Sequence, residues 1–286
     1  MGGSMARNIL KAGYELKVYN RTPAKADALV AEGAKAFASP AELAKACDVI
    51  LSCVSDTPDV LQVVTDARTG VLAGVRAGAI VIDCSTVAPH VAATCAKALS
   101  ARGASFLDAP VSGGDVGARN ATLSIMVGGD KAAFDRALCV LGAMGKTITY
   151  CGPSGAGYVA KLCNQICGGL HVIAAAEAIA LAHAAGTDVR AMLQAVSSGA
   201  AGSWMLTNLA PKIIAGDDKP GFFVDYQLKD LRIAAQACRD LHLTLPGAAL
   251  AEELFQAASA QGFGRCGTQA IYHVIQPSGQ AGQAKR

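Results

Sequence analysis

The chain has 286 residues, of which 52% are hydrophobic and 16% are charged, and its formal net charge is +3. This length favours two folded domains of roughly 150 residues each, and the apolar composition excludes an intrinsically disordered chain. No block of Lys or Arg residues accompanies the small positive charge, so nucleic acid is not an expected partner. Ten cysteines without C-x-x-C pairs predict buried thiols. Cys163, Cys167 and His171 share a helical face but lack a fourth ligand, so no metal is expected.

The first half of the chain alternates short β-branched segments with helical ones. The expected strands are residues 15–20, 49–54, 79–84, 105–108, 124–128 and 147–151, and the expected helices are residues 24–32, 40–46, 90–101 and 131–141. This alternation predicts an α/β fold, a Rossmann-type doubly wound and mostly parallel sheet, over residues 1–152.

Strand signals stop after Gly152, and alanine-rich periodic segments follow. The first has about 28 residues, which would form a helix of roughly 40 Å. We expect this long helix to link the sheet to an all-α domain over residues 153–276 for substrate binding and dimerisation. Polar residues interrupt its apolar run, Lys161 and Glu177 among them, so it predicts a buried helix and not a membrane span. The polar residues 277–286 predict a flexible tail.

Two motifs carry the chemistry. Residues 108–114 read DAPVSGG, and their Gly-rich turn leaves backbone amides and a hydroxyl free to hold a carboxylate. Residues 152–165 read GPSGAGYVAKLCNQ, in which Lys161 and Asn164 are three residues apart and share a helix face. Desolvation brings the pKa of a lysine in an apolar helix toward neutrality, which suits proton transfer. A lysine that snorkels from a buried helix is the alternative interpretation.

Both motifs resemble signatures of the β-hydroxyacid dehydrogenases, which include 3-hydroxyisobutyrate dehydrogenase, tartronate-semialdehyde reductase and glyoxylate reductase. The resemblance implies that Lys161 and Asn164 are catalytic. It implies substrate binding by Ser112, Gly113, Gly114 and Gln165, the last of which replaces the family's second Asn. Residues 229–231 read KDL and match a third family signature, which implies cofactor contacts at Lys229 and Asp230. The resemblance also implies cofactor contacts from the loops after two of the expected strands, at Cys53, Val54, Ser55, Ser85 and Thr86. Without the resemblance, the ordinary interpretation of Ser85 and Thr86 is that they cap the start of the following helix.

The opening residues MGGSMARNIL predict a helix, whereas a dinucleotide-binding unit normally begins with a strand. They are similar to the end of the family's fingerprint G-x-G-x-M-G-x-x-M-A-x-N-L, with Gly2 as its third glycine. The resemblance implies that Gly2 faces the cofactor and that the first strand and two glycines are absent through N-terminal truncation. A translation start assigned too late would give the same sequence. We expect a chain extended upstream to be more stable and to bind cofactor better.

Residues 17–22 read KVYNRT and fall where a second strand would meet the adenosine ribose. An acidic residue there would suit NAD, whereas Asn20, Arg21 and Thr22 offer donors and a positive charge to a 2′-phosphate. The expected cofactor is therefore NADP(H), with NAD(H) as the alternative. A solvated surface turn is the ordinary structural interpretation of these three residues.

Together the signatures imply an NAD(P)-dependent oxidoreductase that interconverts a small carboxylate-bearing semialdehyde and a 3-hydroxy acid. Residues 202–205 and 220–222 look more like tartronate-semialdehyde reductases, so 2-hydroxy-3-oxopropionate reductase is the favoured activity. A 3-hydroxyisobutyrate dehydrogenase, a glyoxylate or succinic-semialdehyde reductase, and a non-catalytic dinucleotide-binding or scaffolding protein stay open. A homo-oligomer, dimer or tetramer, is expected. The lack of a visible signal peptide predicts a cytoplasmic location.

Overall fold

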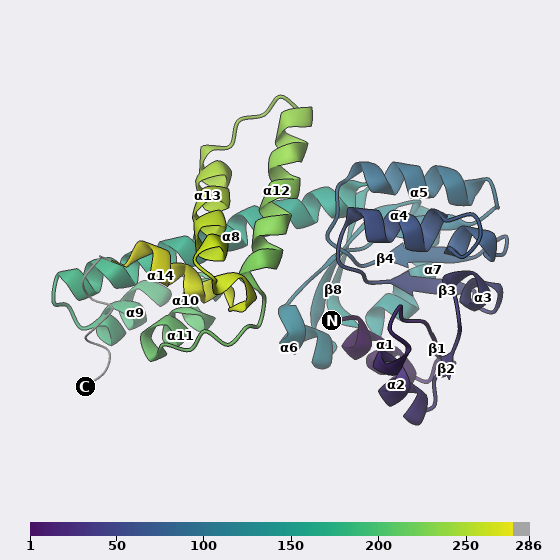
Figure 1. Ribbon diagram of the computed structural model, residues 1–286, viewed down its shortest axis with the longest axis horizontal. Helices are drawn as coiled ribbons and strands as arrows, with labels where there is room; N and C mark the ends of the chain where they lie inside the picture. The colour runs from purple at the N-terminus through teal and green to yellow at the C-terminus, as the bar shows by residue number, and fades with distance from the viewer. Residues whose placement is uncertain (277–286) are drawn as a thin grey trace. The chain divides into compact units, whose positions relative to one another are not determined.

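The computed structural model describes residues 1–276, and the tail expected at 277–286 lies outside them (Figure 1). The chain divides into two compact units, one of residues Met1–Lys161 and one that begins at Leu162. The last strand of the first unit, β8, ends at Gly152, where the sequence places the end of the first domain. The division between the units falls later, inside the long helix α8 (Ala156–Ala184).

A six-stranded sheet forms the centre of the first unit, in the order β3-β4-β5-β7-β6. The sixth strand, β8, also pairs with β7. Its strands are β3 (Val49–Ser52), β4 (Ile80–Asp83), β5 (Ser105–Asp108), β6 (Val111–Ser112), β7 (Leu123–Gly129) and β8 (Gly145–Gly152). The first three are mutually parallel, and β7 runs antiparallel to β5. The α/β fold with a mostly parallel sheet, expected from the sequence, is confirmed.

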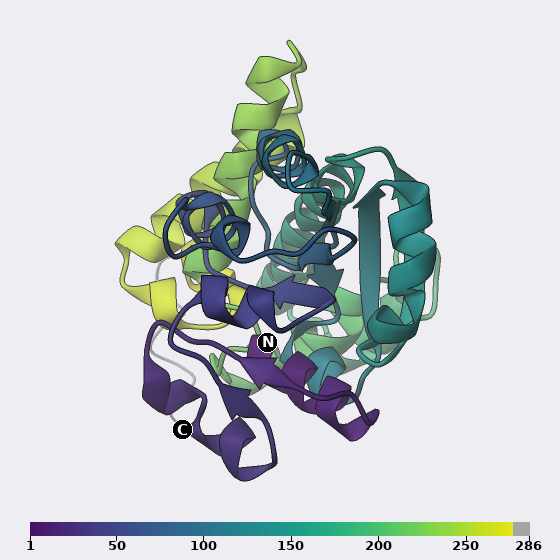
Figure 2. The same ribbon diagram turned by 90° about the vertical axis from the view of Figure 1, so that its right-hand side faces the viewer.

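Helices cover both faces of this sheet (Figure 2). The helices of the first unit are α1 (Gly2–Lys11), α2 (Asp27–Ala31), α3 (Pro40–Lys45), α4 (Thr57–Thr65), α5 (His90–Ser100), α6 (Gly114–Arg119) and α7 (Lys131–Gly142). Of these, α2 packs against β1 (Lys17–Val18) of a second, smaller sheet and not against the six-stranded one. Successive residues of β4 point to opposite faces, so Ile80 and Ile82 join the core under α1 and α7 while Val81 joins the core under α4 and α5. Burial on both faces explains why β4 is apolar without polar alternation.

A separate two-stranded parallel sheet pairs β1 (Lys17–Val18) with β2 (Lys35–Ala36). The strand expected at 15–20 is therefore shorter than predicted. Neither β2 nor α4 is anticipated by the sequence interpretation. Both residues of β2 are exposed and carry no apolar alternation, and α4 starts from a local cap in which the Asp56 carboxylate accepts the Thr57 amide.

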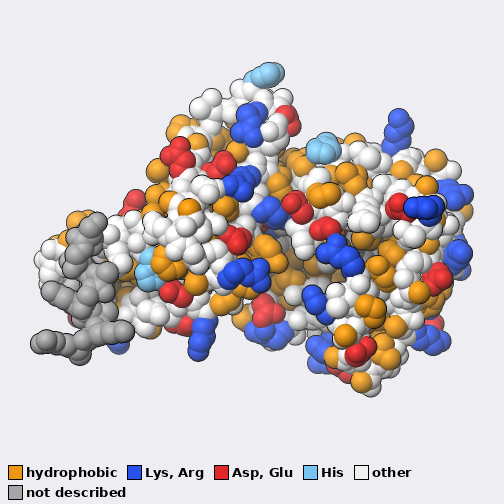
Figure 3. Space-filling view, viewed as in Figure 1, with side chains coloured by type: hydrophobic (Ala, Val, Ile, Leu, Met, Phe, Trp, Pro, Cys, Tyr) orange, Lys and Arg blue, Asp and Glu red, His pale blue; other side chains and the backbone are white. Residues whose placement is uncertain are grey.

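The second unit is helical, apart from one isolated β-bridge between Phe223 and Gly267. After α8 it contains α9 (Val189–Ser197), α10 (Trp204–Asn208), α11 (Ala210–Ala215), α12 (Val224–Asp240), α13 (Pro246–Ala260) and α14 (Tyr272–Ile275). Its core gathers Ile179 of α8, Leu231 of α12 and Phe255 of α13. Among the described residues, α8 alone is long and apolar enough to cross a bilayer, but half of that apolar window is buried inside the protein. On the face shown in Figure 3, basic and acidic side chains are interspersed.

Candidate active site

The N-terminus of α1 lies against the loop that follows β3. A Cβ built at Gly2 would lie 3.5 Å from the Cβ of Cys53, an ordinary van der Waals contact that shows how near the helix start is to this loop. No side chain caps the first turn of α1, and no acidic residue occupies it. Asn8 donates from Nδ2 to the carbonyl of Ala118 at 2.7 Å, which ties α1 to α6. The first-turn amides of α1 can therefore face an anionic group.

The turn after β1 contains the three residues expected at the adenosine ribose. Asn20, Arg21 and Thr22 are all exposed, and the Thr22 amide donates to Oδ1 of Asn20 at 2.9 Å. The Arg21 guanidinium lies 3.3 Å from the Asp59 carboxylate, and its side chain is 81% exposed. This ion pair is weak because water screens it, so Arg21 can turn toward an anionic ligand.

A buried carboxylate connects the loops that follow β3 and β4. Asp83 accepts hydrogen bonds from the hydroxyls of Ser52 at 2.5 Å and Ser85 at 2.9 Å, and from the Ser85 amide. The Ser85 hydroxyl in turn accepts the amide of Val54 at 2.9 Å. Burial raises the pKa of Asp83, and these donors oppose that rise. Ser85 therefore holds the two loops together, which the sequence does not reveal.

The two loops differ in exposure. Cys53 and Val54 are half-buried and Ser55 is exposed, while Ser85 is buried and Thr86 is half-buried. Strands β3 and β4 are parallel neighbours, so both loops leave the same edge of the sheet. That edge is where open α/β sheets bind their ligands.

The expected carboxylate-binding turn follows β6. Gly113 and Gly114 adopt φ angles of 120° and 63°, a region that favours glycine. Both are exposed, and Ser112 beside them is half-buried in the β6–β7 pairing. No side chain caps the short helix α6 that begins at Gly114. The turn thus presents backbone amides and one hydroxyl to solvent.

Lys161 lies in the second turn of α8, and its side chain is buried, with 7% of its surface exposed. The start of α8 is held by Asp108, which accepts the amides of Gly155 at 2.8 Å and Tyr158 at 3.0 Å. Tyr158 also donates its hydroxyl to Asp83 at 2.7 Å. Sequence reasoning does not single out Asp83, Asp108 or Tyr158 as functional, although Asp108 and Tyr158 lie inside the two motifs that it quotes.

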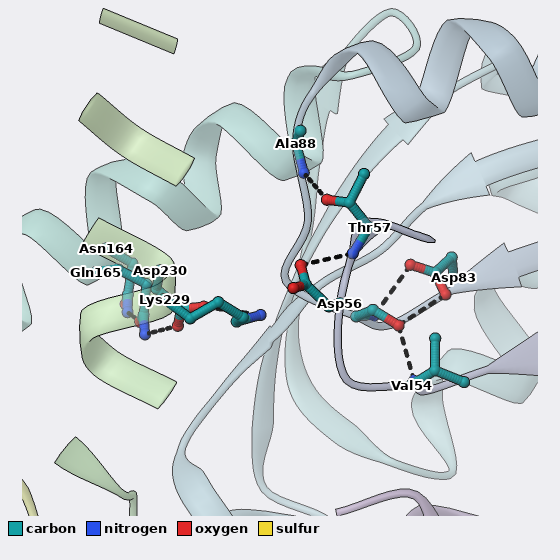
Figure 4. Close-up of polar contacts among 10 residues, drawn as sticks. Val54, Asp56, Thr57, Asp83, Ala88, Asn164, Gln165, Lys229 and Asp230 are labelled. Carbon is teal, nitrogen blue, oxygen red and sulfur yellow. Dashed lines mark hydrogen bonds and ion pairs between the residues drawn. The ribbon is translucent and has the colours of Figure 1, made fainter. Parts of the chain in front are cut away.

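The remaining expected site residues belong to the second unit and form one hydrogen-bonded group. Asn164 donates from Nδ2 to Oε1 of Gln165 at 2.8 Å, and Gln165 donates to the buried Asp230 (Figure 4). The Lys229 ammonium lies 3.1 Å from Oδ1 of Asp230. Gln227 donates to the Gln165 carbonyl at 2.9 Å. Gln165 thus connects Asn164 to the Lys229–Asp230 ion pair.

Across residues 1–276, no group of three or more His, Cys, Asp or Glu side chains is arranged to hold a metal ion. Cys163 and Cys167 carry free thiols and are exposed on α8, as is His171.

The carboxyl edge of a parallel sheet and an uncapped helix N-terminus are the features that dinucleotide-binding folds present to their cofactor. Residues 1–152 match the model of the NAD-binding domain of 6-phosphogluconate dehydrogenase, and residues 155–275 match the NAD-binding domain of NADP-dependent 3-hydroxyisobutyrate dehydrogenase. The chain belongs to the β-hydroxyacid dehydrogenase family.

Individual relatives match over nearly the whole chain. An uncharacterised oxidoreductase of Synechocystis is 47% identical over 95% of this chain and 93% of its own. The 2-hydroxy-3-oxopropionate reductase of Escherichia coli is 36% identical over 96% and 94%. The structure of 3-hydroxyisobutyrate dehydrogenase from Mycobacterium tuberculosis with L-serine superposes with a TM-score of 0.89 at 31% identity, covering 97% and 96% of the two chains. The chain is therefore an NAD(P)-dependent β-hydroxyacid dehydrogenase.

Proposed function

We propose that this enzyme reduces a small semialdehyde carboxylate of the tartronate-semialdehyde type to the 3-hydroxy acid, reversibly and with NADP(H). The observation that carries the proposal is Lys161, a buried lysine near the start of a helix whose first turn is fixed by buried carboxylates. The relative from Escherichia coli, a 2-hydroxy-3-oxopropionate reductase, supports this choice of substrate.

The reduction needs one hydride and one proton. A nicotinamide cofactor, when bound, would supply the hydride to the aldehyde carbon, and the carbonyl electron pair would then reside on the oxygen. The ammonium of Lys161 gives its proton to that oxygen and is left neutral. Asn164 orients the carbonyl by donating from Nδ2, which has a second hydrogen besides the one that it donates to Gln165.

The substrate carboxylate is assigned to the turn at residues 112–114. Its amides and the Ser112 hydroxyl donate hydrogen bonds, and bonds to an ionised acceptor are the stronger kind. The cofactor is assigned to the first turn of α1 and to the loops at residues 53–55 and 85–86. Arg21 beside the ribose favours the 2′-phosphate of NADP(H).

A substrate panel tests the proposal directly. Tartronate semialdehyde, methylmalonate semialdehyde, succinic semialdehyde and glyoxylate are each assayed with NADPH and with NADH. We expect the highest kcat/KM for tartronate semialdehyde with NADPH. A preference for methylmalonate semialdehyde would instead establish 3-hydroxyisobutyrate dehydrogenase, which the L-serine complex of the Mycobacterium relative makes the second candidate. No turnover of any of them would favour a non-catalytic protein.

The role of Lys161 is tested by Lys161→Ala. We expect turnover to be abolished while the Kd for NADPH stays within about twofold, because the lysine transfers a proton and does not anchor the cofactor. Lys146→Ala, at an exposed position on β8, is the control and should retain full activity. Near-normal turnover by Lys161→Ala would rule out the mechanism.

A further inference from the structure

Two buried carboxylates at the ends of neighbouring strands bind the start of α8. Asp83 ends β4 and Asp108 ends β5, and the two residues are partners in the strand register. Asp108 accepts the backbone amides of Gly155 and Tyr158, whereas Asp83 accepts the Tyr158 hydroxyl at 2.7 Å. The first turn of the helix is therefore held through its backbone by one strand and through a side chain by the next.

This attachment is tight and favourable for physical reasons. The first amides of a helix lack partners within the helix, and a carboxylate there also interacts favourably with the helix dipole. A Cβ built at Gly157 would lie 2.3 Å from the Asp108 carbonyl oxygen and 2.5 Å from that of Met126. The helix start cannot move against the sheet without breaking charged hydrogen bonds or these close contacts.

Asp83 also holds the loops assigned to the cofactor. It accepts the hydroxyls of Ser52 and Ser85, and Ser85 accepts the amide of Val54. Lys161 lies three residues after Tyr158, about one helical turn along the same face. One carboxylate is thus connected to both cofactor loops and to the helical turn that precedes the lysine.

We propose that Asp83 and Tyr158 are positioning residues that fix Lys161 relative to the cofactor loops after β3 and β4. The proposal rests on the proposed role of Lys161 as proton donor. A small displacement of a donor lowers the rate of the chemical step more than it weakens ligand binding, because transfer requires a near-attack geometry.

The test compares two tyrosines in the same unit that differ in what their hydroxyls bind. Tyr158→Phe removes the hydroxyl that Asp83 accepts, and Tyr150→Phe removes one that donates to the Gly129 carbonyl at 3.0 Å, outside this network. We expect Tyr158→Phe to lower kcat about tenfold or more, with KM and the Kd for NADPH within about twofold. Tyr150→Phe should keep its kcat. A wild-type kcat in Tyr158→Phe, or equal losses of kcat in both variants, would overturn the proposal.

A second readout requires no substrate. The reductive methylation of Lys161 by formaldehyde and cyanoborohydride is followed by peptide mass spectrometry, with Lys146 as the internal reference. Tyr158→Phe should change the rate at Lys161, and Tyr150→Phe should not. An unchanged rate in Tyr158→Phe would contradict the positioning role. A changed rate in a protein that turns over no semialdehyde would support positioning and count against the proposed function alone.

Discussion

Arg21 and Asp59 allow cofactor preference to be tested at single residues. Arg21 is exposed and paired weakly with Asp59, so Arg21→Ala should weaken NADPH binding about tenfold and leave NADH binding unchanged, because only NADPH carries the 2′-phosphate. Asp59→Ala should tighten NADPH binding, since it removes the competing carboxylate. Fluorescence titrations of both cofactors measure the effects. Equal losses for NADPH and NADH in Arg21→Ala would exclude a contact with the phosphate.

The buried Lys229–Asp230 pair should be energetically coupled far more strongly than a surface pair. The Asp230 side chain is 2% exposed and that of Lys229 is 21% exposed, whereas Lys131–Asp135 is an exposed pair on α7. Double-mutant cycles with Lys→Met and Asp→Asn should give a coupling of about 1–3 kcal/mol for the buried pair and about 0.3–0.5 kcal/mol for the surface pair. Urea unfolding provides the free energies. Equal couplings would show that burial does not strengthen the pair.

The residues to which we assign chemistry are proposed from local sequence patterns, but the side chains that contact them could not be predicted. Lys161 and Asn164 share a helix, so their spacing alone places them on one face. The contact between Gln165 and Asp230 joins residues 65 positions apart, and that between Asp83 and Tyr158 joins residues 75 apart. Only the packing of α8 against α12, or the order of the strands, brings such residues together. Local patterns therefore miss the residues that position others.

At the scale of elements, the start of α8 depends on glycine. Gly157→Ala would place a Cβ against two carbonyl oxygens of β5 and β7, so we expect a loss of about 1–3 kcal/mol in the free energy of unfolding. Gly142→Ala is the matched control, because Gly142 ends α7 and has no atom within 4 Å of an added Cβ. It should be neutral or slightly stabilising. A neutral Gly157→Ala would mean that the helix start can shift.

Elements with a strong apolar pattern were predictable, and elements without one were not. Strands β4 and β5 are apolar runs bounded by polar residues, and the predicted end of β5 at Asp108 agrees with the structure. Helix α4 has a proline in its first turn and a cap from Asp56, signals that the alternation of apolar segments does not reveal. Strand β2 has two exposed residues and forms through pairing with β1 alone. Tertiary pairing decides such short segments.

Across the whole molecule, the two buried carboxylates affect how stability varies with pH. Burial raises the pKa of Asp83 and of Asp108, so the folded state holds their protons more tightly than the unfolded chain. The contribution of these two protonated carboxyls to the free energy of unfolding is full below the unfolded pKa of about 3.9. It is lost as pH rises through the folded pKa. In Asp83→Asn, the free energy of unfolding should therefore decline less steeply as pH rises from the unfolded pKa to the folded pKa.

Denaturation of wild type and variant at several pH values on both sides of about 4 measures this difference. Asp66 is the control of opposite sign, because the amides of Thr69 and Arg68 lower its pKa. Its contribution is present above the unfolded pKa and is lost as pH falls through the folded pKa. Parallel pH curves for wild type and Asp83→Asn would contradict the assignment.

The division of the first unit into two sheets has a consequence for amide hydrogen exchange. Among the described strands, β3 pairs with β4 alone. The carbonyls of Asp48 and Ser52 accept bonds from the β4 side, so the amides of Ile50 and Ser52 face β4 and those of Val49 and Leu51 face away. Deuterium uptake resolved by NMR should therefore alternate along this strand, faster at Val49 and Leu51 than at their neighbours. Uniform protection would mean that the outer edge of β3 is covered in solution.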